Sequence, residues 1–309
     1  MLEKVAVTPR SLSLKGHPAL QELTRAGYEV VFPTPGRQPT LAEQETFLPL
    51  CVGYLAGVEP IPGDLLRQCS GLRVISRNGT GVDAIDLAAA AEMAIAVERT
   101  AGANAQGVAE LAMALMFALM RNIPWSNAAV KNGLWNRREG VEVRGRVLGV
   151  VGCGQIGRRV VELGLGVGMV ARACDQVEDA SFRPSGDFQY LPLHGVLAHA
   201  DVVSLHCPPG PRPLIDAGAL GRMKRGSYLI NTARAQLVDD TSILAALIDG
   251  TLAGFATDVY AIEPPEVTAL LAHDRVIVTP HVGGLTKESV ERATRGAVEN
   301  LLRVLEARA

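Results

Sequence analysis

The sequence of 309 residues predicts an α/β protein with two doubly wound domains, each built on a parallel sheet. Three observations carry this prediction. Short apolar runs alternate with helix-like segments along the chain, and this alternation is typical of parallel sheets with helices on both faces. A glycine turn at residues 152–157 lies between an apolar run and a helical pattern. The chain is also long enough to form two hydrophobic cores.

The first predicted domain comprises residues 1–99 together with 284–309, and it is expected to be flavodoxin-like. Strands are predicted at residues 5–7, 29–32, 52–55, 73–76 and 95–97. Helices are predicted at residues 18–26, 41–48, 64–69 and 85–92. The closing helix is predicted at residues 286–305, with Thr286 as its N-cap and acidic residues in its first turn. We expect this helix to return to the first domain.

The second predicted domain, residues 100–283, contains the glycine turn. Residues 105–121 read as one long helix that is apolar almost all round, so we expect it to pack between domains or between subunits. Residues 122–146 look like a connecting arm. Strands are predicted at residues 147–151, 169–173, 200–206, 228–231, 254–259 and 276–279, and helices after residue 155 and at 240–249. A cleft between the two domains, closing by a hinge, is expected to hold the active site.

The glycine turn has the spacing G-x-G-x-x-G, formed by Gly152, Gly154 and Gly157. In a dinucleotide-binding Rossmann unit these glycines permit a tight turn, the close approach of a pyrophosphate and close helix–strand packing. Asp175 ends the next strand, 18 residues after Gly157, where it can accept hydrogen bonds from the ribose hydroxyls. Its charge would repel a 2′-phosphate, which favours NAD over NADP. Arg172 lies nearby in the sequence and leaves some tolerance of NADP open.

The composition excludes several other classes of function. The net charge is −2, which gives no electrostatic attraction for nucleic acid or for an anionic membrane. Five cysteines without metal-ligand spacing argue against a disulfide framework or a metal site. No signal peptide or membrane-spanning run is found. We therefore expect a cytoplasmic protein whose ligands are small molecules.

Polar residues follow the predicted strands of the second domain. Asp175, Cys207, Arg234, Asp258 and His281 all lie at or just after such ends. In an open parallel sheet, ligands bind outside the carboxyl ends of the strands. These five residues are therefore expected to converge on the dinucleotide.

Four stretches resemble signatures of the D-isomer-specific 2-hydroxyacid dehydrogenases, in the family's order along the chain. They are residues 78–83 (NGTGVD), 231–234 (NTAR), 258–265 (DVYAIEPP) and 279–284 (TPHVGG). This resemblance implies hydride transfer between NAD and a D-2-hydroxy acid. Residues 77–81 (RNGTG) resemble the D-3-phosphoglycerate dehydrogenase branch of the family. We take 3-phosphoglycerate as the first expected substrate, and glyoxylate or hydroxypyruvate reduction as the alternative.

The resemblance also implies roles for three catalytic residues. Arg234 would bind the substrate carboxylate and polarise the keto oxygen, because a guanidinium keeps its charge and can bind a carboxylate through two hydrogen bonds. His281 would exchange the proton. Glu263 would orient the imidazole and favour its protonated form. His206 also follows a strand, and we assign it to the cofactor side.

The remaining predicted contacts come from the fingerprint and from the resemblance. The residues predicted to bind NAD are Thr80, Gly152, Gly154, Gln155, Ile156, Gly157, Asp175, His206, Cys207, Pro208, Thr232, Ala233, Asp258, Gly283 and Gly284. The residues predicted to bind substrate are Arg77, Asn78 and Gly79. The chain departs from the family's usual pattern at Ala84, at 210–213 and at Ala235, which leaves the substrate and the loop details open.

Two other functions compete with this interpretation. A dinucleotide-sensing protein that acts like a corepressor would bind NADH without turnover, and a simple NADP reductase would show the opposite cofactor preference. The apolar helix at 105–121 and the arm after it predict a homodimer, because a monomer would expose a large apolar patch. No C-terminal regulatory domain is expected, since the chain ends with the closing helix.

Overall fold

The computed structural model describes residues 2–307. The chain divides into two compact units: residues 1–104 with 285–309, and residues 105–284. Each unit has one sheet in which all strand pairs are parallel, with five strands in the first unit and seven in the second. The predicted fold class of two parallel-sheet α/β domains is thereby confirmed.

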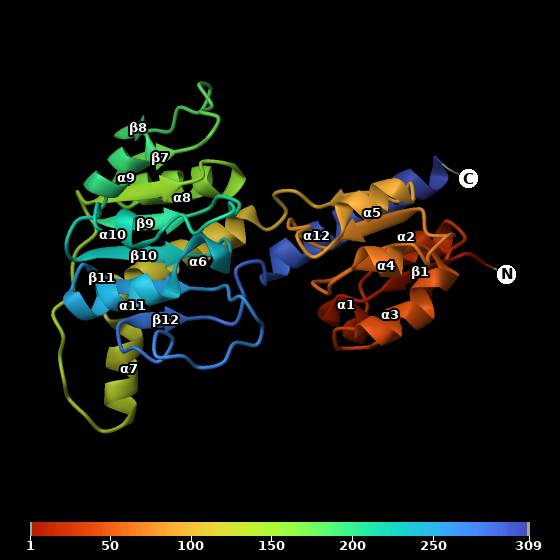
Figure 1. Ribbon diagram of the computed structural model, residues 1–309, viewed down its shortest axis with the longest axis horizontal. Helices are drawn as coiled ribbons and strands as arrows, with labels where there is room; N and C mark the ends of the chain where they lie inside the picture. Colours follow the sequence, from red (N-terminus) through yellow and green to blue (C-terminus); the bar gives the residue numbers. More distant parts are fainter. Residues whose placement is uncertain (1, 308–309) are drawn as a thin grey trace. The chain divides into compact units, whose positions relative to one another are not determined.

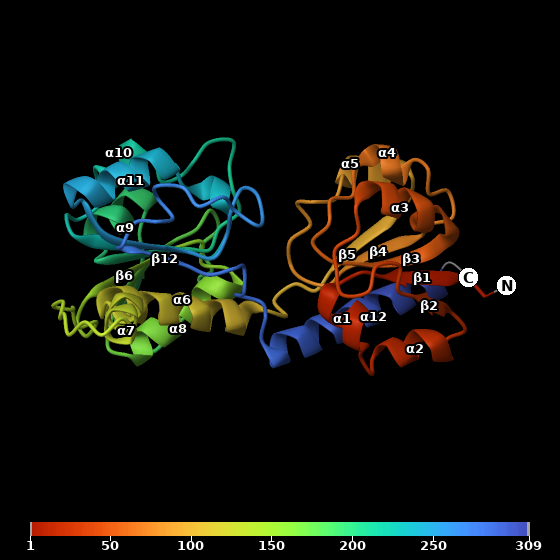
Figure 2. The same ribbon diagram turned by 90° about the horizontal axis from the view of Figure 1, so that it is seen from below.

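The sheet of the first unit has the order β2-β1-β3-β4-β5. Its strands are β1 (Lys4–Val7), β2 (Glu29–Val31), β3 (Cys51–Ala56), β4 (Val74–Arg77) and β5 (Ala96–Arg99). Its helices are α1 (Arg10–Lys15), α2 (Leu20–Arg25), α3 (Leu41–Phe47), α4 (Gly63–Leu66), α5 (Leu87–Glu92) and α12 (Lys287–Glu306), with a 3-10 turn at Leu48–Leu50. Helices α1, α2 and α12 cover one face and α3, α4 and α5 the other (Figure 2). Both faces of this sheet are therefore buried.

Helix α12 begins where the sequence predicts. The Thr286 side chain accepts a hydrogen bond from the Ser289 backbone N–H, and Glu288 lies in the first turn. The buried face of the helix, which includes Val298, Leu301 and Leu305, packs against β3 and β4. The C-terminal segment thus completes the core of a domain whose strands all come from the N-terminal third of the chain.

The sheet of the second unit has the order β12-β11-β10-β9-β6-β7-β8. Its strands are β6 (Val147–Val151), β7 (Val170–Cys174), β8 (Phe188–Tyr190), β9 (Val202–Leu205), β10 (Ser227–Asn231), β11 (Leu252–Thr257) and β12 (Val276–Val278). Its helices are α6 (Ala105–Met120), α7 (Ile123–Lys131), α8 (Gln155–Gly166), α9 (Leu193–His199), α10 (Ala217–Leu220) and α11 (Asp240–Asp249), with a 3-10 turn at Ala235–Leu237. Helices α6 and α8 lie on one face and α9 and α11 on the other (Figures 1 and 2).

Helix α6 packs against α8 and against β10 and β11, which explains why it is apolar almost all round. The segment after it differs from the predicted arm, because residues 123–131 form helix α7. Pro124 in the first turn favours a helix start there, since its missing N–H is not needed at that position. Among the described residues no single helix has the length and apolar composition to cross a membrane; α6 and α7 reach that length only together, bent by 62° at their junction.

Candidate active site

The candidate site of the second unit lies along the carboxyl edge of its sheet. The strands that precede Asp175, Cys207, Arg234, Asp258 and His281 are β7, β9, β10, β11 and β12. These strands are parallel, so the five residues lie along the same edge of one sheet. The structure thus places these five residues at the ends of strands of one sheet, with four strands between β12, which precedes His281, and β7, which precedes Asp175.

The glycine turn after β6 leaves no room for side chains at two of its three glycines. Gly152 has φ +90°, and a Cβ there would lie 2.6 Å from the backbone of His206 and Cys207. A Cβ at Gly157 would lie 2.0 Å from the Gly152 carbonyl oxygen. Gly154 is different: it is exposed, and a Cβ there would meet no atom within 4 Å. The first and third glycines therefore serve packing, whereas the open space at Gly154 suits a bound pyrophosphate.

Helix α8 begins at Gln155, with Gly154 as its N-cap and no side-chain cap. The first N–H groups of a helix have no intrahelical partner and attract anions. At the end of the neighbouring strand, the Asp175 carboxylate accepts hydrogen bonds from the backbone N–H groups of Cys153 at 2.6 Å and of Val177 at 3.2 Å. Its two oxygens keep acceptor capacity for ribose hydroxyls. These residues fit an NAD molecule across the turn.

Arginines near this turn already have carboxylate partners. Arg172 pairs with Asp187 at 2.8 Å. Arg158, in the first turn of α8, pairs with Asp179 at 2.7 Å and so ties down the loop that follows Asp175. Hydrogen bonds from Ser181, and after them this ion pair, lower the pKa of the Asp179 carboxyl. Both guanidinium groups therefore pair with carboxylates of the protein itself. This pairing agrees with a site for the ribose of NAD, which carries no 2′-phosphate.

His206 and Cys207 follow β9, beside the first glycine of the turn. The imidazole Nε2 of His206 lies 2.8 Å from the Ser204 hydroxyl, and burial lowers the pKa of His206 to about 3. Burial also raises the pKa of the Cys207 thiol. His206 is therefore neutral at physiological pH, which makes it unsuited to charge stabilisation and consistent with its assignment to the cofactor side.

The stretch after β10 is shaped by a residue that the sequence analysis did not single out as a site residue. Asn231 is fully buried; its amide accepts from the Ala233 N–H at 3.1 Å and donates to the Arg234 carbonyl at 2.8 Å. The Arg234 guanidinium in turn donates to the Ala233 carbonyl at 2.7 Å. The Thr232 hydroxyl oxygen is buried and has no hydrogen-bond partner among the described residues. A polar residue that ends an apolar run was the available signal for Asn231.

Glu263 and His281 form a hydrogen-bonded pair. The imidazole Nδ1 lies 2.8 Å and 3.0 Å from the two carboxylate oxygens, and both side chains are partly exposed. A carboxylate can only accept, so Nδ1 carries the proton and Nε2 remains for exchange with a ligand. The pair thus has the geometry of a general acid–base group with an orienting carboxylate.

The backbone around His281 is unusual. His281 has φ +52°, a conformation that costs a non-glycine residue roughly 1–3 kcal/mol. Such strain persists where the surroundings enforce it, and both Asp258 and Tyr260 bond to this segment. Tyr260 and Thr279 were not predicted as site residues, because tyrosine and threonine are ordinary at strand ends.

The residues predicted to contact substrate belong to the first unit. Arg77 ends β4, and its guanidinium donates to the Asn78 carbonyl at 2.6 Å. Thr80, which was predicted to bind NAD, lies in the same unit, and its hydroxyl donates to Asn104 at 2.9 Å. Nearby, the buried Glu59 accepts from the Tyr54 hydroxyl at 2.6 Å and the Gly57 N–H at 2.8 Å, which fixes the loop after β3. Sequence reasoning missed Glu59, because a single acid in a loop is usually exposed.

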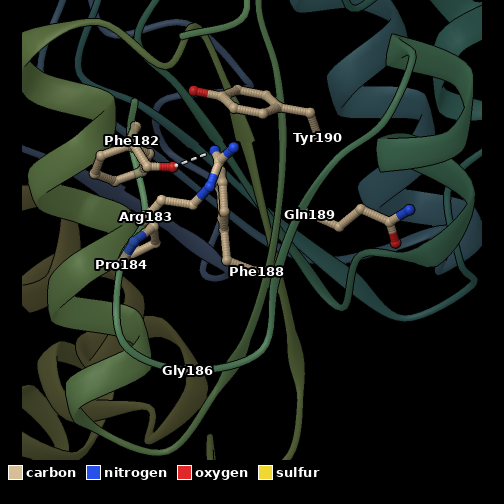
Figure 3. Close-up of a pocket in the computed structure, with 7 residues that line it drawn as sticks. All are labelled: Phe182, Arg183, Pro184, Gly186, Phe188, Gln189 and Tyr190. Atoms are coloured by element: carbon tan, nitrogen blue, oxygen red, sulfur yellow. Dashed lines mark hydrogen bonds between the residues drawn. The ribbon is translucent and has the colours of Figure 1, made fainter. Parts of the chain in front are cut away.

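A pocket at the other end of the second sheet has a volume of about 340 Å³. It is lined by Phe182, Arg183, Pro184, Gly186, Phe188, Gln189 and Tyr190 (Figure 3). These residues belong to the edge strand β8 and the loop before it, whereas His281 follows β12 at the opposite edge. The pocket therefore includes none of the three predicted catalytic residues. Among residues 2–307 no group of His, Cys, Asp and Glu side chains could hold a metal ion.

Comparisons with known proteins agree with this geometry. Residues 113–283, more than half of the chain, match the family model described as "D-isomer specific 2-hydroxyacid dehydrogenase, NAD binding domain". Human D-3-phosphoglycerate dehydrogenase is 35% identical over 247 residues, which cover 78% of this chain and 46% of that protein. The chain thus spans about half the length of the phosphoglycerate dehydrogenases that it matches.

Two other relatives match over most of their own length. Hydroxypyruvate reductase of Thermotoga maritima is 34% identical over 252 residues, which cover 79% of this chain and 81% of that protein. The crystal structure of the TT0316 protein from Thermus thermophilus superposes with a TM-score of 0.89 at 35% identity, and the match covers 98% of this chain and 97% of that one. The chain therefore belongs to the D-isomer specific 2-hydroxyacid dehydrogenase family, and its second unit carries the family's NAD-binding domain.

Proposed function

We propose that the protein interconverts a D-2-hydroxy acid and its 2-keto acid with NAD as the redox partner. The observation that carries this proposal is the Glu263–His281 pair, with Nδ1 held by the carboxylate at 2.8 Å and Nε2 left for proton exchange. Arg234 follows β10, so it lies at the same carboxyl-terminal side of the sheet as His281, and its guanidinium supplies a permanent positive charge. A proton donor, a cation and a dinucleotide site are what reduction of a 2-keto acid requires.

Each group has a defined task in this reaction. NAD, when bound, exchanges the hydride with C2 of the substrate. The N-terminus of α8 and the open space at Gly154 would hold the pyrophosphate, and Asp175 would accept hydrogen bonds from the ribose hydroxyls. Arg234 binds the substrate carboxylate and stabilises negative charge on the keto oxygen. Protonated His281 donates its Nε2 proton to that oxygen during reduction, and neutral His281 removes the proton during oxidation.

For the substrate, we propose 3-phosphoglycerate first, as residues 77–81 suggest, with Arg77 as the phosphate ligand. Hydroxypyruvate or glyoxylate reduction is the second candidate. The 34% identity to the hydroxypyruvate reductase of Thermotoga maritima over 252 residues supports this second candidate.

The test is a steady-state panel with NADH and glyoxylate, hydroxypyruvate or pyruvate, and with NAD and 3-phosphoglycerate. Turnover with one of these acids is expected. Intact NADH binding without any turnover would refute the proposed activity and favour a dinucleotide sensor. Comparing kcat/KM for hydroxypyruvate with that for 3-phosphohydroxypyruvate, the keto acid of 3-phosphoglycerate, both reduced with NADH at the same pH, would decide between the two substrates.

We also propose a homodimer that acts in the cytoplasm. Apolar side chains are exposed on α7 and just after it: Ile123, Val130, Leu134 and Trp135. Trp135 is 81% exposed, and a second copy would remove this surface from water. Sedimentation as a monomer at micromolar concentration would refute the dimer.

The proposal that the protein acts in the cytoplasm rests on its five free cysteines, which are typical of reducing compartments.

A further inference from the structure

We propose that Asp258 and Tyr260 are positioning residues that hold the backbone of the His281 turn, residues 279–283, where His281 must stand to transfer a proton. This inference rests on the proposed function and deepens it. Glu263 fixes the direction of the imidazole ring. The ring can be placed only if the backbone that carries it is also fixed, and the two residues provide that second restraint.

The His281 turn needs outside support. It follows β12, a strand of three residues at the edge of the sheet, which pairs only with β11 among the named strands. The His281 N–H donates to the Thr279 carbonyl two residues earlier at 2.9 Å, which closes a three-residue turn around Pro280. His281 itself lies at φ +52°. A strained turn at the end of a short edge strand would relax without further contacts.

Asp258 supplies three of those contacts. It follows β11 directly and is 1% exposed. Its Oδ1 accepts from the Thr279 hydroxyl at 2.6 Å and from the Val282 N–H at 2.8 Å, and its Oδ2 accepts from the Gly283 N–H at 2.8 Å. One buried carboxylate therefore bonds to the turn on both sides of His281. Hydrogen bonds to an ionised acceptor are the strong ones.

Tyr260 supplies the fourth contact. Its hydroxyl donates at 2.8 Å to the Thr279 carbonyl, the same oxygen that accepts from the His281 N–H. The segment after β11 thus approaches the turn at three points: Asp258 and Tyr260 bind its backbone, and Glu263 binds its imidazole. The backbone of the turn and the imidazole ring are therefore held by different residues.

The resemblance to the family predicts that Asp258 binds NAD instead, and the two roles predict different results. A cofactor contact would lower NADH affinity when it is lost. A positioning role would lower kcat and loosen the turn in the protein without any ligand, with little change in NADH affinity.

The experiment compares Asp258→Asn and Tyr260→Phe with the control Tyr228→Phe, which removes a hydroxyl that makes no hydrogen bond described in the structure. Hydrogen–deuterium exchange of the ligand-free protein is measured for peptides spanning the His281 turn. We expect Asp258→Asn to speed hydrogen–deuterium exchange at Val282 and Gly283 by about tenfold or more. In the variant one of these two N–H groups donates to a neutral amide oxygen, and the other faces the amide NH2 group, which cannot accept. We expect a smaller increase for Tyr260→Phe and none for Tyr228→Phe.

Kinetics and NADH titration complete the test. We expect kcat to fall by about tenfold or more in Asp258→Asn and by about threefold to tenfold in Tyr260→Phe, with the Kd of NADH within about twofold of wild type. If Asp258→Asn fails to fold, Tyr260→Phe decides alone. Wild-type exchange and kcat in Tyr260→Phe, or an Asp258→Asn variant that loses NADH affinity with kcat unchanged, would overturn the inference. If the wild-type protein turns over no acid, the proposed function fails, and the exchange data alone decide whether the two residues hold the turn.

Discussion

Two alanine substitutions in the glycine turn should separate an effect on stability, expected for Gly157→Ala, from an effect on NADH binding, expected for Gly154→Ala. A Cβ at Gly157 would lie 2.0 Å from the Gly152 carbonyl oxygen and 3.1 Å from a Val150 methyl. Ordinary contact distances begin near 3.4 Å. The obstacle is backbone, so the start of α8 must move by more than 1 Å away from β6, given that 2.0 Å contact. At Gly154 nothing lies within 4 Å, and its φ of −79° suits any residue.

The magnitude follows from the overlap. Overpacking a well-packed core costs about 1–3 kcal/mol, and a clash with backbone belongs at the upper end of that range. For a domain of this size, each kcal/mol lowers Tm by roughly 2–4 °C. We therefore expect Gly157→Ala to lower the Tm of the ligand-free protein by roughly 6–12 °C. Gly154→Ala should leave Tm within about 2 °C of wild type, because surface substitutions usually change stability by less than about 0.5 kcal/mol.

NADH affinity should be affected in Gly154→Ala, the variant whose stability is unchanged. The added methyl group of this variant occupies the space assigned to the pyrophosphate. We therefore expect the Kd of NADH to rise by about tenfold or more, which is the loss expected when a buried polar contact is displaced. Thermal melts of the ligand-free protein and NADH fluorescence titrations measure the two effects. A Gly157→Ala protein that melts with the wild type would refute the packing argument. Unchanged NADH affinity in Gly154→Ala would refute the placement of the pyrophosphate.

Three further predictions concern the site. His281→Ala should lower kcat by about 10²–10⁴-fold with NADH binding nearly intact, and Arg234→Ala should also raise KM for the keto acid; near wild-type kcat in the first would contradict the proton-donor role. Asp175→Ser should weaken NAD binding and improve that of NADP, as read from kcat/KM with each cofactor; a retained preference would remove Asp175 from the ribose site. Burial holds the pKa of His206 at about 3, below its value near 6.5 in the unfolded chain. As the pH falls between these two values, the imidazole is protonated in the unfolded chain but stays neutral in the folded protein, so the folded protein loses stability. The wild type should therefore lose up to about 1.4 kcal/mol more stability per pH unit than His206→Gln over that range, and parallel pH profiles of Tm would contradict the lowered pKa of His206.

Much of the fold is encoded in local patterns. The strand–helix alternation predicts parallel sheets, since each apolar run is short and each intervening segment is long enough to cross over. The glycine spacing between β6 and α8 predicts the dinucleotide turn, because a tight turn and close helix packing each demand glycine at a fixed position. Elements with weak local signals were missed: α7 lay inside the predicted arm, although Pro124 marks its first turn, and the edge strand β8 has three residues.

The groups at the carboxyl edge were predictable for the same reason. Because parallel strands end at one edge, the order of strand ends along the chain predicts that Asp175, Arg234 and His281 lie along the same side of the sheet, as the structure has them. Sequence reasoning could name these groups, but it could not say which atoms they bind. Their functional roles remain predictions that the variants above test.

Only the tertiary structure decided how His281 is held. Asp258 and Gly283 are 25 residues apart in the chain, and Tyr260 and Thr279 are 19 apart; they meet because β11 and β12 are neighbours in parallel register. A hydrogen bond of this kind depends on the twist and register of two strands. It also depends on the backbone conformation of His281, with φ +52°, which the residue type alone does not predict. Local sequence determines which segments become strands and where the chain can turn tightly. The contacts that aim a catalytic side chain are formed between segments, and they exist only once the sheet has brought those segments together.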